Sequence, residues 1–100
     1  MTSINLPAGF ETASRRIFNK EPEIVLEELM ASELRRKLIE YRIVDERFRQ
    51  EYGMGFDEFK KKNIVGRQKH SFNVESDFCD WELAVDGIGT INKELKRILK

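Results

Sequence analysis

The chain has 100 residues, of which 18 are Lys or Arg and 18 are Asp or Glu, so its formal charge is zero. A chain of this length forms one domain with a small core, and oligomerisation is a natural way to complete the burial. The balanced charge excludes a global attraction to nucleic acid or to an anionic membrane. No stretch approaches about 18 consecutive apolar residues, and no signal-peptide pattern opens the chain. We therefore expect a soluble, cytoplasmic protein.

Residues 1–21 carry little hydrophobic periodicity and are expected to form a loosely ordered N-terminal arm, with one short helical turn near 12–18. The pattern changes at Pro22, which suits the first turn of a helix because its missing N–H is not needed there. Apolar residues then recur every three or four positions, and no Pro or Gly intervenes before Gly53. This pattern predicts one long helix over 22–52.

Two glycines, Gly53 and Gly55, end that helix. A short helix is expected over 57–61, where acidic residues precede lysines and so match the helix dipole. The segment 70–74 alternates polar and apolar residues and is expected to be extended. It would serve either as a simple linker or as a strand that pairs with a second copy of itself.

The last helix is expected to begin after a cap at Ser76 or Asp77. Its apolar residues repeat at alternating three- and four-residue steps, which places seven residues on heptad a and d positions. These are Phe78, Trp81, Val85, Ile88, Asn92, Leu95 and Leu99. This seam packs either onto the long helix as an antiparallel hairpin or into a bundle between chains. Asn92 favours the bundle, since one polar a position fixes register and oligomer state.

Two further glycines, Gly87 and Gly89, lie in the middle of the last helix. They cost about 1 kcal/mol each relative to alanine, and they either permit the close approach of a second helix or mark a break in the last helix near 86–90. The elements together predict a mainly α fold, as a long helical hairpin or small helical bundle with a short third helix and an extended segment. This single domain over 22–100 is expected to be completed by oligomerisation, as a dimer.

Seven residues are predicted to contact a partner protein, because they carry apolar or selective polar side chains in or beside the last helix. They are Phe72, Trp81, Ile91, Asn92, Leu95, Ile98 and Leu99. The first half of the helix is expected to pack in the core, where Trp81 is the largest available anchor. The surface left for pairing would then be formed by Ile91, Leu95, Ile98 and Leu99.

A second candidate surface is a local basic patch that could contact nucleic-acid phosphates. It consists of Lys60, Lys61, Lys62, Arg67 and Lys69. No helix-turn-helix, zinc-finger or single-strand-binding signature accompanies it, so a solvated face is the favoured interpretation.

No catalytic, cofactor-binding or metal-binding residue is predicted. Five carboxylates between Glu75 and Asp86 suit the positive end of the last helix, or a basic partner surface, better than a metal. The only cysteine, Cys79, is expected to be a buried, inert thiol near Trp81. The only histidine, His70, has no positioned nucleophile beside it, so an enzyme is not expected.

Three stretches carry a resemblance to known proteins: 41–59, which begins Tyr-Arg-Ile-Val-Asp-Glu; 70–77; and Asp80-Trp81-Glu82. Together, over about 40–86, they resemble small uncharacterised archaeal and bacterial proteins that look like the antitoxin halves of two-gene toxin–antitoxin modules. The resemblance implies a cytoplasmic protein that binds and neutralises a companion toxin, often with autorepression through a DNA-binding part. No residue here matches a DNA-reading motif of such proteins.

The favoured hypothesis is therefore a small protein–protein interaction module, antitoxin-like, whose last helix contacts a partner. One alternative is a self-associating helical structural dimer. The other is a small DNA-binding regulator that uses the basic patch of 60–69.

Overall fold

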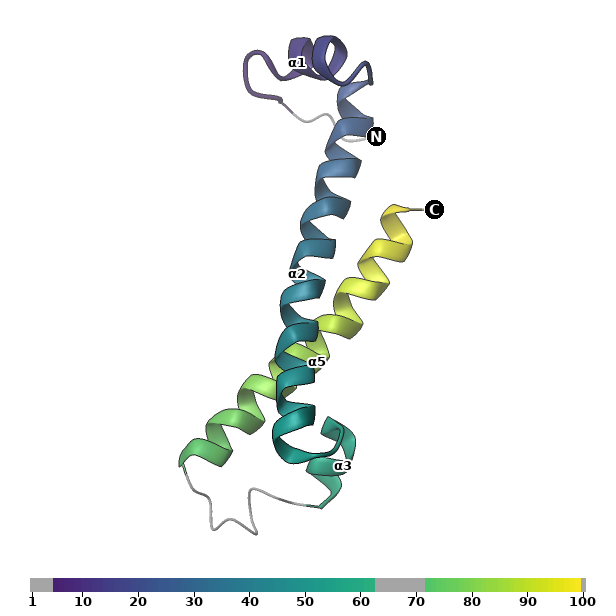
Figure 1. Cartoon of the computed structure of the whole chain (residues 1–100). Helices are drawn as coiled ribbons and strands as arrows, with labels where there is room; N and C mark the ends of the chain where they lie inside the picture. Colours follow the sequence, from purple (N-terminus) through teal and green to yellow (C-terminus); the bar gives the residue numbers. More distant parts are fainter. Residues whose placement is uncertain (1–4, 63–71, 100) are drawn as a thin grey trace.

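The structure, a computed structural model, describes residues 5–62 and 72–99. Within these ranges the chain forms four helices and no strand, which confirms the mainly α fold. The helices are α1 (Phe10–Ile17), α2 (Pro22–Tyr52), α3 (Phe56–Lys61) and α5 (Phe72–Ile98) (Figure 1). None of them, over the described residues, is both long and apolar enough to cross a membrane.

The long helix α2 confirms the prediction over 22–52. Pro22 occupies its first turn, where the missing N–H costs nothing. At the other end, Gly53 has a φ of 67°, in the left-handed region that favours glycine, and its N–H donates to the carbonyl oxygen of Arg49 at 2.8 Å. Pro22 and Gly53 thus determine the two ends of α2 through their backbone conformations, and both can be recognised in the sequence.

The helix predicted near 12–18 is present as α1, which folds back over the start of α2 (Figure 1). The buried Ser14 hydroxyl donates to the carbonyl oxygen of Phe10 at 2.8 Å. An ion pair of 2.6 Å between Lys20 Nζ and Glu28 spans the connection to α2. The hydrogen bond stabilises α1 itself, and the ion pair joins the arm to the start of the long helix.

The core is an aromatic cluster where α2, α3 and α5 meet, at the end of the molecule opposite α1. Phe48, Phe56, Phe59 and Trp81 are buried there, and Phe59 and Trp81 are fully inaccessible to solvent. Half-buried side chains surround this cluster, namely Val44, Tyr52, Met54, Val74, Phe78 and Val85. Burying large rings contributes several kcal/mol in total and explains why the short α3 is held in place.

The extended segment predicted over 70–74 is wrong for residues 72–74, which form the first turn of α5, while residues 70 and 71 lie outside the described ranges. Val74 lies one turn before Phe78, and both pack against the aromatic cluster. Burying Val74 on that face favours a continued helix over an extended chain. The helix therefore begins before Ser76 and Asp77, the predicted caps.

Figure 1 shows α5 running antiparallel to α2, crossing it, and separating from it toward the C-terminal end. At the crossing, the backbone of Gly87 lies so close to the ring of Tyr41 that an added Cβ atom would overlap it. Nothing lies within 4 Å of the corresponding position at Gly89. The hairpin within one chain is therefore formed, and the prediction of close approach is confirmed at Gly87 alone.

The 31 residues of α2 make the molecule long, since at about 1.5 Å per residue they span roughly 46 Å. Its radius of gyration is 19.7 Å and its extents are 59 × 25 × 25 Å. A compact domain of this length has a radius of gyration of about 13 Å. Much of α2 and of the second half of α5 consequently lies outside the aromatic core.

Candidate interaction surfaces

Two hydrogen bonds between helices hold α5 against α2. The indole N–H of Trp81 donates to Asp45 Oδ1 at 2.8 Å, and the hydroxyl of Tyr52 donates to Asp77 Oδ2 at 2.5 Å. Asp45 also accepts a 3.1 Å hydrogen bond from Arg49 Nε. Asp77, one of the five carboxylates between Glu75 and Asp86, thus has a structural role in the core.

Burial, together with the hydrogen bond to Asp77, raises the pKa of the Tyr52 hydroxyl well above its ordinary value. An unfolded tyrosine ionises near pH 10, whereas folded Tyr52 keeps its proton there. The contribution of neutral Tyr52 to the free energy of unfolding is therefore fully present below about pH 10. It is lost as the pH rises from there towards the pKa of the folded state.

The variant Tyr52→Phe should lose about 1 kcal/mol of unfolding free energy at pH 7, because it lacks the hydrogen bond to Asp77. It should also show a shallower fall of stability above about pH 10 than the parent protein. Urea denaturation between pH 7 and 11 measures both effects. Tyr41→Phe is the control, since the Tyr41 hydroxyl makes no hydrogen bond to a described residue. An equal alkaline slope in Tyr52→Phe and the parent protein would contradict the assignment.

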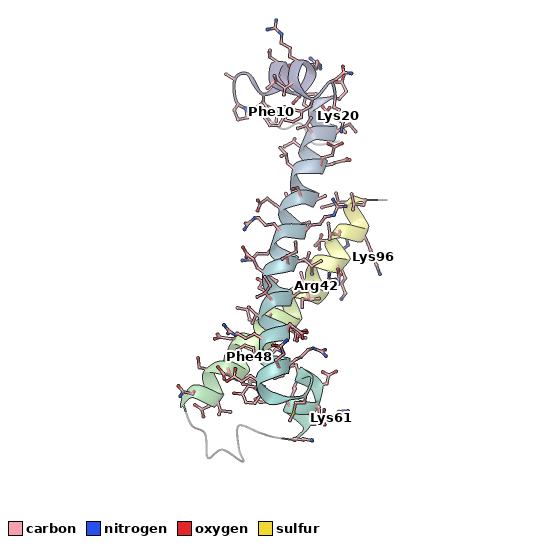
Figure 2. The ribbon with its side chains drawn as sticks, viewed as in Figure 1. Phe10, Lys20, Arg42, Phe48, Lys61 and Lys96 are labelled. Atoms are coloured by element: carbon pink, nitrogen blue, oxygen red, sulfur yellow. The ribbon has the colours of Figure 1, made fainter. Side chains whose placement is uncertain are left out.

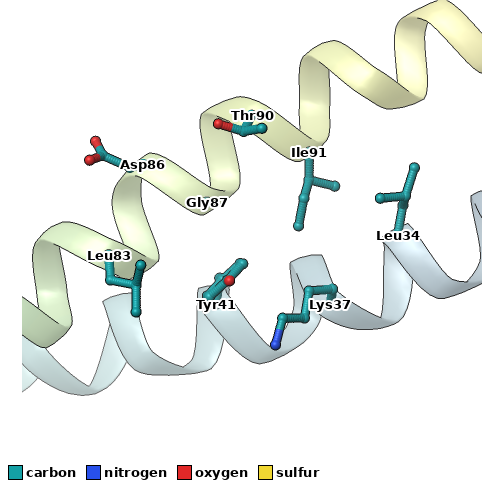
Figure 3. A pocket seen from close by; sticks show the side chains of 8 residues that line it. All are labelled: Leu34, Lys37, Tyr41, Leu83, Asp86, Gly87, Thr90 and Ile91. Carbon is teal, nitrogen blue, oxygen red and sulfur yellow. The ribbon is translucent and has the colours of Figure 1, made fainter.

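The first candidate surface is a groove of about 330 Å³ beside the helix crossing, here called the crossing groove (Figure 3). Its lining residues come from both helices: Leu34, Lys37, Tyr41, Leu83, Asp86, Gly87, Thr90 and Ile91. Leu83 is 64% exposed, although it is a large apolar side chain in the middle of a helix. Lys37 comes from α2 and Asp86 from α5, so the groove offers apolar contact between two opposite charges.

The second candidate surface lies on the end of α5 that has separated from α2. It is an open surface formed by Asn92, Leu95, Lys96 and Leu99, here called the tail face. Leu99 is 51% exposed, and the half-buried carboxamide of Asn92 makes no hydrogen bond to a described residue. Figure 2 shows Lys96 on this end, away from Phe48 in the core.

The residues predicted to contact a partner divide into two groups. Trp81 is 0% exposed and packs inside the protomer, whereas Ile91 is 6% exposed and lines the crossing groove with the little surface that it presents. Asn92, Leu95 and Ile98 are half-buried, and with Leu99 they remain on the open end of α5. Phe72 begins α5, and its side chain lies outside the described part of the chain.

The predicted basic patch is only partly described. Lys60, Lys61 and Lys62 are exposed at the end of α3, where Lys62 forms a 3.0 Å ion pair with Glu58. Arg67 and Lys69 lie outside the described residues. The described part is thus a surface of mixed charge.

The thiol of Cys79 is exposed, which corrects the prediction of a buried thiol. It lies two residues before Trp81, and two helical residues differ in direction by about 200°. Because Trp81 points into the core, Cys79 faces outward. In the described ranges, no group of three or more His, Cys, Asp or Glu is arranged to hold a metal ion.

Several exposed apolar residues were not predicted as surface. Ile39 and Ile43 belong to the apolar residues that recur every three or four positions in the long helix, yet they are 58% and 63% exposed. They lie four residues apart on one face of α2, about 100° or more from Leu38, which is buried. Their angular distance from the buried positions was the available signal.

No family model matches the chain, and neither the curated proteins nor the solved structures contain a match to it.

Proposed function

We propose that this chain is a small, non-catalytic protein–protein interaction module that works in the cytoplasm and binds a partner protein through the crossing groove. The observation that carries the proposal is the amount of large apolar surface left uncovered within residues 5–62 and 72–99. Nine such side chains are exposed, namely Ile17, Phe18, Ile24, Leu29, Met30, Ile39, Ile43, Leu83 and Leu99. Where such side chains lie together in a patch, they mark interaction sites in soluble proteins.

One of these exposed side chains, Leu83, lines the crossing groove, where residues of two helices come together. Gly87 lets the ring of Tyr41 pack directly against the backbone of α5, and Leu34, Tyr41 and Leu83 offer apolar contact along the groove. An amphipathic segment of a partner could place an apolar anchor there, with an acidic group near Lys37 and a basic group near Asp86. The resemblance to antitoxins supports a companion toxin as that partner.

Co-expression with the product of the adjacent gene, followed by size exclusion, tests the proposal. The two proteins should elute together, and Leu83→Glu should abolish co-elution while leaving the circular dichroism spectrum unchanged, because Leu83 is exposed. Ile43→Glu is the matched control, since Ile43 is 63% exposed and does not line the groove. Separate elution of the parent proteins, or equal loss in both variants, would remove the proposal.

A further inference from the structure

We infer that the tail face binds a second copy of this chain, and that the contact is made with the first half of the copy's α2. This goes beyond the proposed function, because the tail face and the crossing groove share no lining residue. In a two-fold dimer the contact occurs twice: each α5 end lies along the partner's α2, and each α2 receives the partner's α5 end.

Charge segregation is the first observation that supports a second copy. The first half of α2 carries Glu23, Glu27, Glu28 and Glu33 and no basic residue before Arg35. The end of α5 carries Lys93, Lys96 and Arg97 against one acid, Glu94. A chain of zero net charge therefore presents one acidic and one basic helix segment, each complementary to the other.

Only part of this charge is paired within the protomer: Glu28, Glu33 and Arg97 form local ion pairs, with Lys20, Arg36 and Glu94 respectively. Glu23 and Glu27 are exposed, as are Lys93 and Lys96, and none of the four forms an ion pair with another described residue. After the crossing at Gly87, the end of α5 runs away from α2 of the same chain (Figure 1). Its basic residues can therefore pair with the acidic first half of α2 in a second molecule.

Exposed area is the second observation. The chain exposes 7863 Å², whereas a compact monomer of 11.8 kDa exposes about 5,900 Å². The excess is larger than the roughly 800 Å² per partner that a standard interface buries. The same two segments hold apolar side chains for this contact. On α2, Met30 is 56% exposed and lies on the helix face of Glu23 and Glu27, and on α5 Leu95 and Leu99 line the tail face.

Asn92 is the third observation. Its carboxamide lies in the tail face among leucines and, among the described residues, has no hydrogen-bond partner. If a second helix buried this carboxamide against apolar side chains, the carboxamide would need a hydrogen bond from that helix. A polar residue in a helical seam also selects one register between the two helices. A partner helix that supplies a hydrogen bond to Asn92 would therefore be held in one axial register against α5.

Light scattering after size exclusion of the full chain, at 10 to 100 µM, tests the inference. The parent protein should have a mass of about 24 kDa, twice 11.8 kDa. Lys93→Glu/Lys96→Glu and Glu23→Lys/Glu27→Lys should each weaken dimerisation by roughly tenfold or more, because every reversal acts twice in a two-fold complex. An equimolar mixture of the two variants should regain the dimer, since both of its contacts are again between opposite charges.

The control Glu46→Lys/Glu51→Lys makes the same change of charge on exposed residues of the second half of α2 and should remain a dimer. A monomeric parent protein at 100 µM would overturn the inference. A dimer that survives both reversals would overturn it as well, because the contact would then lie on another face. Neither result depends on the adjacent gene product, so it leaves the proposed function to its own test.

Discussion

Replacement of Trp81 by alanine should lower the unfolding free energy by about 3–5 kcal/mol. The side chain is fully buried, and its ring centroid lies 5.0 Å from Phe59, 5.4 Å from Phe56 and 5.5 Å from Phe48. Its removal leaves a cavity among three helices and deprives Asp45 of the indole hydrogen bond. Small domains are stable by only about 5–15 kcal/mol, so Trp81→Ala should be close to unfolded at 37 °C.

Urea denaturation followed by circular dichroism measures this loss. Leu83→Ala, on the same helix and 64% exposed, should change the stability by no more than about 0.5 kcal/mol. Trp81→Phe should lie between the two, because it keeps most of the ring contact and loses the hydrogen bond. A loss below about 1 kcal/mol in Trp81→Ala would show that the aromatic cluster does not hold the helices together.

The second large effect is the opposite response of two glycines in one helix. Alanine is favoured over glycine in a helix interior by about 1 kcal/mol, so Gly89→Ala should be stabilising by roughly that amount. Gly87→Ala gains the same helix propensity, but its Cβ overlaps the ring of Tyr41. Overpacking of this kind costs about 1–3 kcal/mol, which makes Gly87→Ala neutral to destabilising and places it below Gly89→Ala by about 1–3 kcal/mol.

Thermal and urea denaturation of the two variants give this difference directly. The cause is tested in a Tyr41→Ala background, where the overlapping ring is absent and Gly87→Ala should become as favourable as Gly89→Ala. Equal stabilisation by both alanines in the parent chain would mean that α5 does not approach α2 closely at Gly87.

The helix ends that local chemistry determines were predictable. Pro22 and Gly53 mark α2, and the order of acids and lysines marks α3, which begins at Phe56, one residue before the prediction. The start of α5 was not predictable from the segment alone. Alternation around Val74 indicates an extended chain, whereas burial of Val74 against the aromatic cluster favours a helix.

The heptad seam was predicted well at Trp81 and less well further along. The fully buried positions after Trp81 are Ala84 and Ile91, while Ile88 and Asn92 are only half-buried. A straight helix drifts about 20° per heptad relative to a repeat of 3.5 residues, and α5 crosses α2 instead of winding around it. The buried stripe therefore moves around the helix, which explains why Ile91 is a core residue.

The candidate surfaces were predictable in part. The apolar residues at the end of the chain indicated a contact surface, and Leu95, Ile98 and Leu99 lie on the open end of α5. The crossing groove was not predictable, because it depends on which residues of α2 and α5 face each other. Likewise, nothing in the sequence distinguishes Gly87 from Gly89 before the position of Tyr41 is known.

The aromatic core at one end of α2 leaves the other half of the helix with little support. Between Val25 and Leu38, Ala31 is the one buried residue. A helix of about 12–15 residues is only marginally stable in water without tertiary packing, so this half opens at a lower free energy than the half that holds Phe48. A partner that covers the first half of α2 also stabilises the helical backbone there. The measured binding free energy then includes the free energy of ordering this part of the helix. Association and local folding of α2 are thus coupled in a single equilibrium.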